Sequence, residues 1–276
     1  MVKDLLFEEL SISSEVDKIG NELTQQIIDK LSKDEGKYQH FIGGITFLSK
    51  QIYVVPKNMI FGSIYNIEVY EYIFDDENQA LLAYDKIDVG GDFDEKNGTI
   101  LIHFLSLGKE HNIKMMRSFL YHELKHAYQA SLYTTEATSN VLQIATTIIS
   151  KPYLYLNYVY EFSRLIYFFS KKEMDANMET LYQELIAKDS DDVNMLKEYM
   201  LHLQLYEECQ HYIADDNVCN TLYETYGKTF KQLMFYIKHG IQYFENKKRK
   251  VLMKYMNYRK RIQNENKTFR RFCFIK

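Results

Sequence analysis

The sequence predicts an α+β protein in which a small, mostly antiparallel, twisted sheet packs on one central helix, followed by a predominantly helical half. Three observations indicate this class. Between residues 40 and 106, hydrophobic residues come in short β-prone runs, one of which alternates between apolar and polar positions. Outside that segment, apolar residues recur three and four positions apart, as in amphipathic helices. Only two of the 276 residues are proline, which disrupts helix interiors, so long helices are permitted.

A helix is expected at the start of the chain, over residues 1–36. Ser13 or Ser14 can act as its N-cap, and the apolar residues that follow recur at helical spacing as far as Leu31. Gly36 is a plausible stop, because glycine adopts the left-handed conformation that ends many helices. We interpret this segment as an amphipathic packing helix.

The sheet is expected within residues 40–106. Residues 64–74 alternate between apolar and polar side chains, as they do when one face of a strand is buried. Asn97-Gly98 is a strong hairpin signal, and it directly precedes the β-prone run 99–105. The other strands expected from the sequence are residues 41–47, 52–56 and 81–87.

The central helix is expected at residues 109–133, and the chain after it is helical almost to its end. A polar run at residues 187–192 suggests a division into a first domain, residues 1–188, and a helical extension, residues 189–276. The same run could also be a helix cap. The further helices expected are residues 136–150, 154–169, 171–187, 192–213 and 226–263.

Composition excludes several classes of protein. The three cysteines, Cys209, Cys219 and Cys273, are too few and too scattered for a disulfide framework, which favours a reducing compartment. No apolar run reaches the length of a membrane span, and the first ten residues contain acids where a signal peptide needs an apolar core. We therefore expect a cytoplasmic protein, or one incorporated into an assembly made in the cytoplasm.

An H-E-x-x-H motif, formed by His122, Glu123 and His126, lies within the expected central helix. Histidines four residues apart on a helix share one face, so their imidazoles can bind one zinc ion. Glu123 lies beside them, where its carboxylate can take a proton from a polarised water. The alternative is a pair of surface histidines that bind no metal.

A β-run, a short loop and a helix carrying this motif resemble the zincin metallopeptidases, in particular gluzincin-like families with a distant glutamate ligand. The resemblance covers roughly residues 90–180. It implies one zinc ion, hydrolysis of peptide bonds with Glu123 as general base, and a substrate lying antiparallel along an edge strand before the helix. That strand would be residues 99–105. The residues expected to line it are Ile100, Ile102 and His103.

The third zinc ligand has to come from elsewhere in the chain. Gln129 and Leu132 stand where the metzincin extension has glycine and histidine, and the thermolysin-like downstream pattern is absent. Several zincin families carry a glutamate ligand on a later helix, which matches Glu173, with Asn177 on the same face to orient a ligand histidine. Alternatively, Ser170 and Glu173 form a capping box. The other candidate ligands are Asp175 and Glu136.

The end of the chain is strongly basic. Residues 246–276 contain twelve lysines or arginines and one acid, a local net charge of +11, whereas the whole chain carries −4. Such a segment can bind nucleic acid or another acidic partner, or it can be a solvated face that pairs with the acidic remainder of the chain. The cations proposed for a partner surface are Lys247, Lys248, Arg249, Lys250, Arg259, Lys260, Arg261, Arg270 and Arg271.

The sequence thus predicts a zinc-dependent metallopeptidase that acts on a protein or peptide. Its oxyanion donor is left open among His103, Tyr128, Tyr160 and several other tyrosines. Two alternatives stand beside this prediction. One is a structural or interaction protein that retains a zincin-like fold, and the other is a nucleic-acid-associated protein that uses the basic C-terminal helix.

Overall fold

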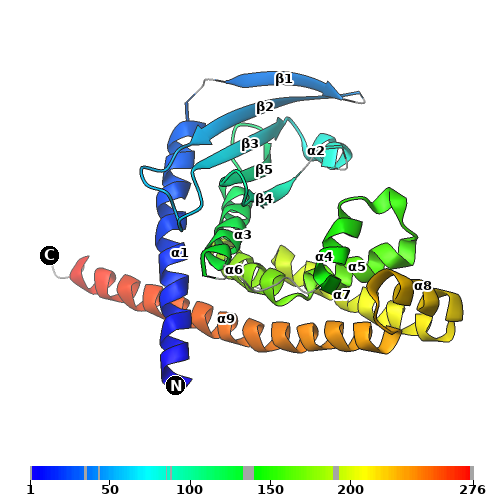
Figure 1. The fold of residues 1–276 in the computed structure, drawn as a ribbon. Helices are drawn as coiled ribbons and strands as arrows, with labels where there is room; N and C mark the ends of the chain where they lie inside the picture. Colours follow the sequence, from blue (N-terminus) through cyan, green and yellow to red (C-terminus); the bar gives the residue numbers. More distant parts are fainter. Residues whose placement is uncertain are drawn as a thin grey trace. The chain divides into compact units, whose positions relative to one another are not determined.

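The protein, described here from a computed structural model, is an α+β protein, as the sequence predicts (Figure 1). Its chain divides into two compact units, residues 1–135 and 136–276. The division falls before the helix at residues 171–188, whereas the sequence suggested a boundary after it, because that helix packs among the helices of the second unit. The described residues are 2–33, 36–42, 44–84, 86–87, 89–132, 140–188 and 193–273, except for the side chains of 2–14, 84, 132, 188 and 263–273.

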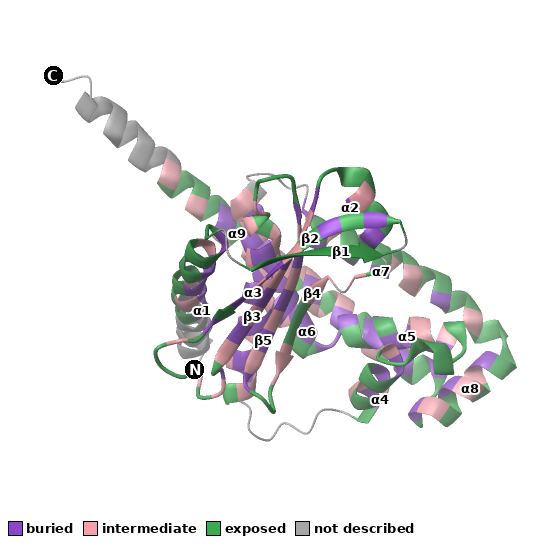
Figure 2. Ribbon diagram, turned by 90° about the horizontal axis from the view of Figure 1, so that it is seen from above, coloured by how far each residue is buried: buried purple, intermediate pink, exposed green. Residues whose placement is uncertain are grey.

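The first unit is built on a five-stranded sheet with the order β1-β2-β3-β5-β4. Only β3 and β5 pair in parallel, and the other neighbouring strands pair antiparallel, which confirms the prediction of a mostly antiparallel sheet. Figure 2 shows buried and less buried residues alternating along the central strands, as a sheet with one covered face requires. The strands are β1 (Lys37–Ile42), β2 (Ile45–Val54), β3 (Asn66–Phe74), β4 (Gly90–Asp94) and β5 (Thr99–Leu107).

The strand before the central helix is interior, so the prediction that it forms the sheet edge is wrong. β5 pairs with β3 on one side and with β4 on the other. The hairpin at Asn97-Gly98, where Gly98 has a φ of 59°, folds the preceding strand back onto β5 and makes β4 the edge. Ile100 and Ile102 are fully buried, and His103 points to the opposite face of the sheet.

Two helices cover one face of this sheet. α1 (Val2–Leu31) and α3 (Ile113–Leu132) pack together and share a hydrophobic core with β2, β3 and β5. Their approach is close at Gly20, where an added Cβ would lie 2.3 Å from Cζ of Tyr121. α1 continues through Ser13 and Ser14, so the predicted cap at these serines is wrong and the helix begins at Val2.

One segment that the sequence suggested as a strand, residues 81–87, belongs mainly to a helix, α2 (Glu77–Tyr84). The Asp76 carboxylate accepts a hydrogen bond from the Gln79 N–H at 2.9 Å and so caps the helix. Ala80 packs towards the sheet, whereas Leu81 is 66% exposed. Its apolar residues therefore follow a helical arrangement although their types had suggested a strand.

The second unit is helical and has its own hydrophobic core, which includes Phe162, Leu181, Leu222 and Phe244. Its last helix, α9, contacts α5, α6, α7 and α8. The sequence missed α8 although it carries clear end signals: Asp215 caps its start, and Gly227 follows with a φ of 62°. The elements are α4 (Asn140–Ile149), η1 (Pro152–Leu154), α5 (Asn157–Phe168), α6 (Lys171–Lys188), α7 (Asn194–Gln210), η2 (His211–Ala214), α8 (Asp216–Tyr226) and α9 (Phe230–Cys273).

Candidate metal centre

The motif helix α3 is anchored at its start by a buried carboxylate on the sheet. Glu71, fully buried on β3, accepts hydrogen bonds from the Ser106 hydroxyl at 2.5 Å and from Nδ1 of His111 at 2.7 Å. The Asn112 N–H donates to the same serine oxygen, and the Asn112 side chain then caps the helix by accepting from the Met115 N–H. These bonds tie the loop between β5 and α3 to the sheet and fix where the motif begins.

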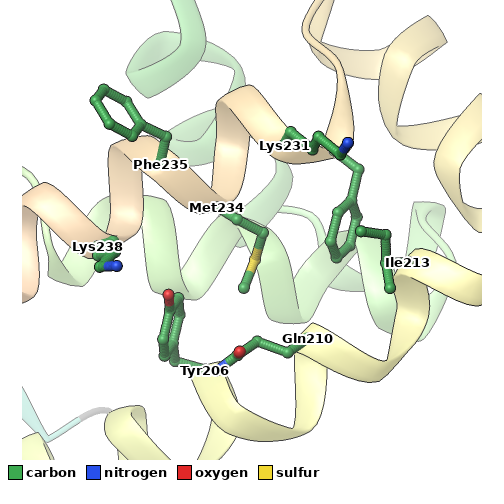
Figure 3. A pocket seen from close by; sticks show the side chains of 8 residues that line it. Tyr206, Gln210, Ile213, Lys231, Met234, Phe235 and Lys238 are labelled. Atoms are coloured by element: carbon green, nitrogen blue, oxygen red, sulfur yellow. The ribbon is translucent and has the colours of Figure 1, made fainter.

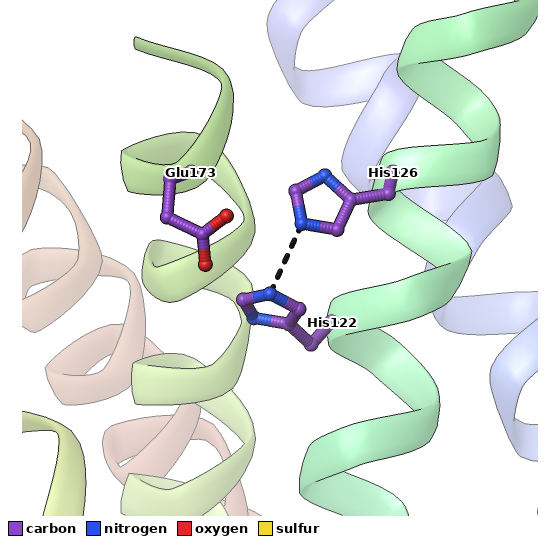
Figure 4. Close-up of side chains that lie close together, drawn as sticks. All are labelled: His122, His126 and Glu173. Atoms are coloured by element: carbon purple, nitrogen blue, oxygen red, sulfur yellow. Dashed lines mark hydrogen bonds between the residues drawn. The ribbon is translucent and has the colours of Figure 1, made fainter. Parts of the chain in front are cut away.

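The two motif histidines converge on one face of α3, opposite the apolar face that packs on the sheet (Figure 4). Their Nε2 atoms lie 3.1 Å apart. Zinc binds imidazole nitrogen at about 2.0–2.1 Å, so two nitrogens at this separation would subtend roughly 100° at one ion, close to the tetrahedral angle. The prediction that His122 and His126 share one face of the helix is confirmed, and their spacing is compatible with one shared metal ion.

Gln129 contacts a motif histidine, and sequence reasoning missed this contact. Its Oε1 lies 3.2 Å from Nδ1 of His126, so it can accept the Nδ1–H and leave Nε2 deprotonated. Ligand histidines in metalloproteins characteristically donate their other ring N–H in this way, which fixes the tautomer and the ring orientation. The available signal was its position three residues after His126, which places both side chains on neighbouring parts of one helix face.

Glu123 is buried, and the backbone of the edge strand β4 passes directly against its side chain. A Cβ added at Gly91 would lie 2.7 Å from Cγ and 2.8 Å from Oε1 of Glu123. Because Gly91 has no side chain, the Glu123 carboxylate can occupy the space where a Cβ would otherwise lie. The contact also places the candidate general base beside the strand at the sheet edge, where an added strand would pair.

Glu173 lies in the first turn of α6, and it is buried. Its backbone N–H donates to the Ser170 hydroxyl at 3.3 Å, so half of the suggested capping box is present. The Ser170 N–H donates to the Tyr167 carbonyl at 3.0 Å, which supplies that amide with an acceptor other than the Glu173 carboxylate. The Ser170 side chain can cap α6 without help from the Glu173 carboxylate, so helix capping does not by itself explain why this residue is a glutamate.

Asn177 follows Glu173 by four residues and so shares its face of α6. Its side chain is 5% exposed, and its Nδ2 has no hydrogen-bond partner among the described residues. A buried donor left in this state costs about 1–3 kcal/mol and calls for a partner such as a bound ligand or ordered water. The predicted runner-up ligand Asp175 faces elsewhere, since it accepts from Tyr243 at 2.8 Å and pairs with Lys247.

The candidate oxyanion donors lie in different places. His103 stacks on Tyr70 and bonds Tyr72 on the face of the sheet opposite α3, so its proposed role is wrong. Tyr128 packs edge-on against Phe61. Tyr160 lies on α5 in the second unit. The other runner-up ligand, Glu136, falls outside the described residues.

The basic segment of α9 contains partly buried cations and exposed cations. Lys247 pairs with Asp175, and Lys248 pairs with Glu245 at 2.7 Å. The exposed cations are Arg249, Lys250, Arg259, Lys260 and Arg261, whereas the side chains of Arg270 and Arg271 lie outside the described part of the chain. Pairing with acids of the same unit thus accounts for part of this surface and leaves a solvent-facing remainder.

Among the described residues, one group of ligand types could hold a metal ion: His122, His126 and Glu173 (Figure 4). The histidines belong to the first unit and Glu173 to the second, so coordination by all three together is a proposal. Comparison with family models, with curated proteins and with solved structures found no match to this chain. In the part of the chain that the structure describes, no helix is both long and apolar enough to cross a membrane.

Proposed function

We propose that the protein is a zinc-dependent metallopeptidase. The observation that carries this proposal is the pair of motif imidazoles, whose Nε2 atoms lie 3.1 Å apart on one helix face, with Gln129 positioned to hold the tautomer of His126. Neutral imidazoles in this arrangement fit a zinc ion. Without a metal the same pair can form one N–H···N hydrogen bond between the imidazoles, so zinc analysis distinguishes the two states.

Glu173 is proposed as the third ligand. Two histidines and one glutamate form a common ligand set of catalytic zinc, in which the fourth position stays open for water. The support within α6 is the burial of Glu173 and the alternative acceptor that Ser170 finds. Asn177, with its unsatisfied buried amide one turn along, is the residue proposed to hold a ligand or the substrate in place.

Zinc bound here would lower the pKa of a water molecule and polarise the scissile carbonyl. The Glu123 carboxylate would accept a proton from the attacking water and deliver it to the leaving amine. Gly91 leaves that carboxylate its space, and Gln129 would keep Nε2 of His126 free of a proton. The bond broken is the amide C–N bond; water supplies the second oxygen of the new carboxyl group, and its two hydrogens end on that carboxyl group and on the leaving amine.

The substrate is proposed to pair with β4, not with β5, because β4 is the edge strand on the α3 side of the described sheet. An extended peptide added to an edge is held by main-chain hydrogen bonds, which tolerate many side chains. Gly91 on this strand touches Glu123, so a peptide paired there would lie beside the general base. This assignment replaces the strand expected from the sequence.

A quenched-fluorescent peptide library tests the proposal. The wild-type protein should cleave members of the library, and Glu123→Gln should lower the rate by about 10²–10⁴-fold while it retains zinc. His126→Ala should lose both its bound zinc and its cleavage activity. If the wild type binds zinc but cleaves no library member under any condition, the protein is instead a metal-containing structural or interaction protein, which is the first alternative.

A second candidate function rests on the exposed basic residues of α9. Arg259, Lys260 and Arg261 are consecutive and exposed, as in surfaces that contact nucleic-acid phosphates. This candidate is a nucleic-acid-associated protein. It predicts binding to a single-stranded oligonucleotide that weakens steeply with salt and is reduced when these three residues become glutamine. Salt-insensitive binding, or binding unchanged in the triple variant, would exclude it.

A further inference from the structure

A groove in the second unit lies between α7, η2 and α9, and none of the residues proposed for the metal centre lines it (Figure 3). Its cavity measures about 390 Å³, within the range of about 300–1,000 Å³ that is usual for ligand sites. All three elements belong to the same compact unit and share its core. The lining residues are Tyr206, Gln210, Ile213, Phe230, Lys231, Met234, Phe235 and Lys238.

Several apolar side chains line the groove. Met234 is partly buried and lies between the two ends in Figure 3. Ile213 and Phe235 are 52% and 64% exposed, although large apolar side chains are normally covered. Apolar residues that gather around a cavity and stay exposed are typical of a surface that contacts a partner.

The two ends of the groove are cationic. Lys231 and Lys238 are both exposed on α9, and seven residues separate them, which corresponds to about 10.5 Å along a helix. The lining contains no acid, and within the described chain neither lysine forms an ion pair. The groove therefore presents two positive charges that the protein itself does not neutralise.

Hydrogen-bond donors lie beside these charges. Figure 3 shows Tyr206 near Lys238 at one end of the groove, with Gln210 further along α7. Burial raises the pKa of Tyr206 above its ordinary value, so the phenol keeps its proton and can donate it to an anion. A carboxylate at this end would meet a lysine ammonium and a phenol O–H together.

We propose that this groove binds an acidic peptide segment. An apolar side chain of the peptide enters between Met234 and Ile213, and two carboxylates contact Lys231 and Lys238. Carboxylates seven residues apart on a helix, or three apart on an extended chain, match the spacing of the lysines. A simple fatty acid carries one carboxylate and would use only one end, so the two-ended charge favours a peptide.

Fluorescence anisotropy with a labelled peptide tests this proposal on the full chain. The probe is Glu-Ala-Ala-Leu-Leu-Ala-Ala-Glu, whose acids are seven residues apart around two leucines. Saturable binding is expected, and it should weaken about fivefold in the double variant Lys231→Gln/Lys238→Gln. Met234→Ala should also weaken it. Lys228→Gln changes an exposed lysine that does not line the groove and should bind as the wild type does.

Three outcomes would overturn the proposal. These are the absence of saturable binding, equal binding by the double variant, and displacement of the probe by laurate but not by unlabelled peptide. A matched peptide with lysines in place of its glutamates should not bind; binding of that peptide would show that charge plays no part and would also overturn the proposal. Circular dichroism of each variant verifies that the helices are intact, so that a loss of binding reports on the groove.

Discussion

Substitution of Gly91 by alanine tests the placement of the general base. The added Cβ would lie 2.7 Å from Cγ of Glu123, whereas ordinary contacts begin at 3.4 Å, so one of the two groups has to move by about 0.7 Å. β4 is held by its pairing with β5, and we therefore expect the Glu123 side chain to shift. Misplacement of a catalytic group by about 1 Å can cost about 100-fold in rate, which predicts a 10- to 100-fold lower kcat.

The assay is cleavage of the best library peptide, combined with zinc analysis. Gly90→Ala is the matched control, because a Cβ at Gly90 meets nothing within 4 Å on the same strand. Gly91→Ala should keep its zinc, because the contact involves Glu123 and not a histidine, while Gly90→Ala should keep both zinc and rate. Equal kcat values for the two variants would refute the argument that β4 constrains the Glu123 carboxylate.

Three further predictions concern buried polar groups. Lys50, 1% exposed, donates to the carbonyls of Leu31 and Lys33 at the end of α1, so Lys50→Met should cost about 1–3 kcal/mol in urea denaturation, whereas exposed Lys57→Met should change stability by less than about 0.5 kcal/mol. Asn177→Leu removes an unsatisfied buried amide, so it should leave stability unchanged or higher yet lower the cleavage rate about tenfold; a destabilised variant with full activity would contradict its role. Burial lowers the pKa of His202 to about 4, so the unfolded chain takes up a proton between about pH 6.5 and 4 while the folded chain does not. Stability should therefore fall over that window as pH falls, by on the order of 3 kcal/mol, and His202→Phe should remove this slope.

The motif helix could be predicted because its information is local. The spacing of His122 and His126 fixes their common face, and the apolar residues of α3 fix the opposite one, so both follow from helical periodicity. The contact between Gln129 and His126 could also have been predicted from the sequence. Gln129 was considered only as the residue that replaces a metzincin glycine, although its position three residues along the helix placed it beside the imidazole.

The edge of the sheet could not be predicted, because strand order is a property of pairing between distant segments. The run at Thr99–Leu107 looks alike whether it is an edge or an interior strand, and only its parallel pairing with β3 makes it interior. The segment around Leu81 shows a different limit. Its short apolar run fits either a strand or a helix, and the deciding feature was the cap at Asp76, which lies outside the run.

The missed helix α8 had a different cause. Asp215 and Gly227 mark its two ends by well-known rules, yet no element was predicted from the sequence between the helices expected at residues 192–213 and 226–263. The unsatisfied amide of Asn177 could be predicted neither from local end signals nor from strand pairing. A sequence shows that an asparagine follows Glu173 at helical spacing, but only packing shows that its Nδ2 is buried without a partner.

The central claim is that His122, His126 and Glu173 hold one zinc ion, and metal analysis of the purified protein tests it most directly. We expect one equivalent of zinc in the wild type and in Glu123→Gln, and a strong loss in His126→Ala and Glu173→Ala. If His126→Ala loses zinc but Glu173→Ala retains it, Glu173 is not the third zinc ligand. Less than about half an equivalent in the wild type would contradict the metal centre itself.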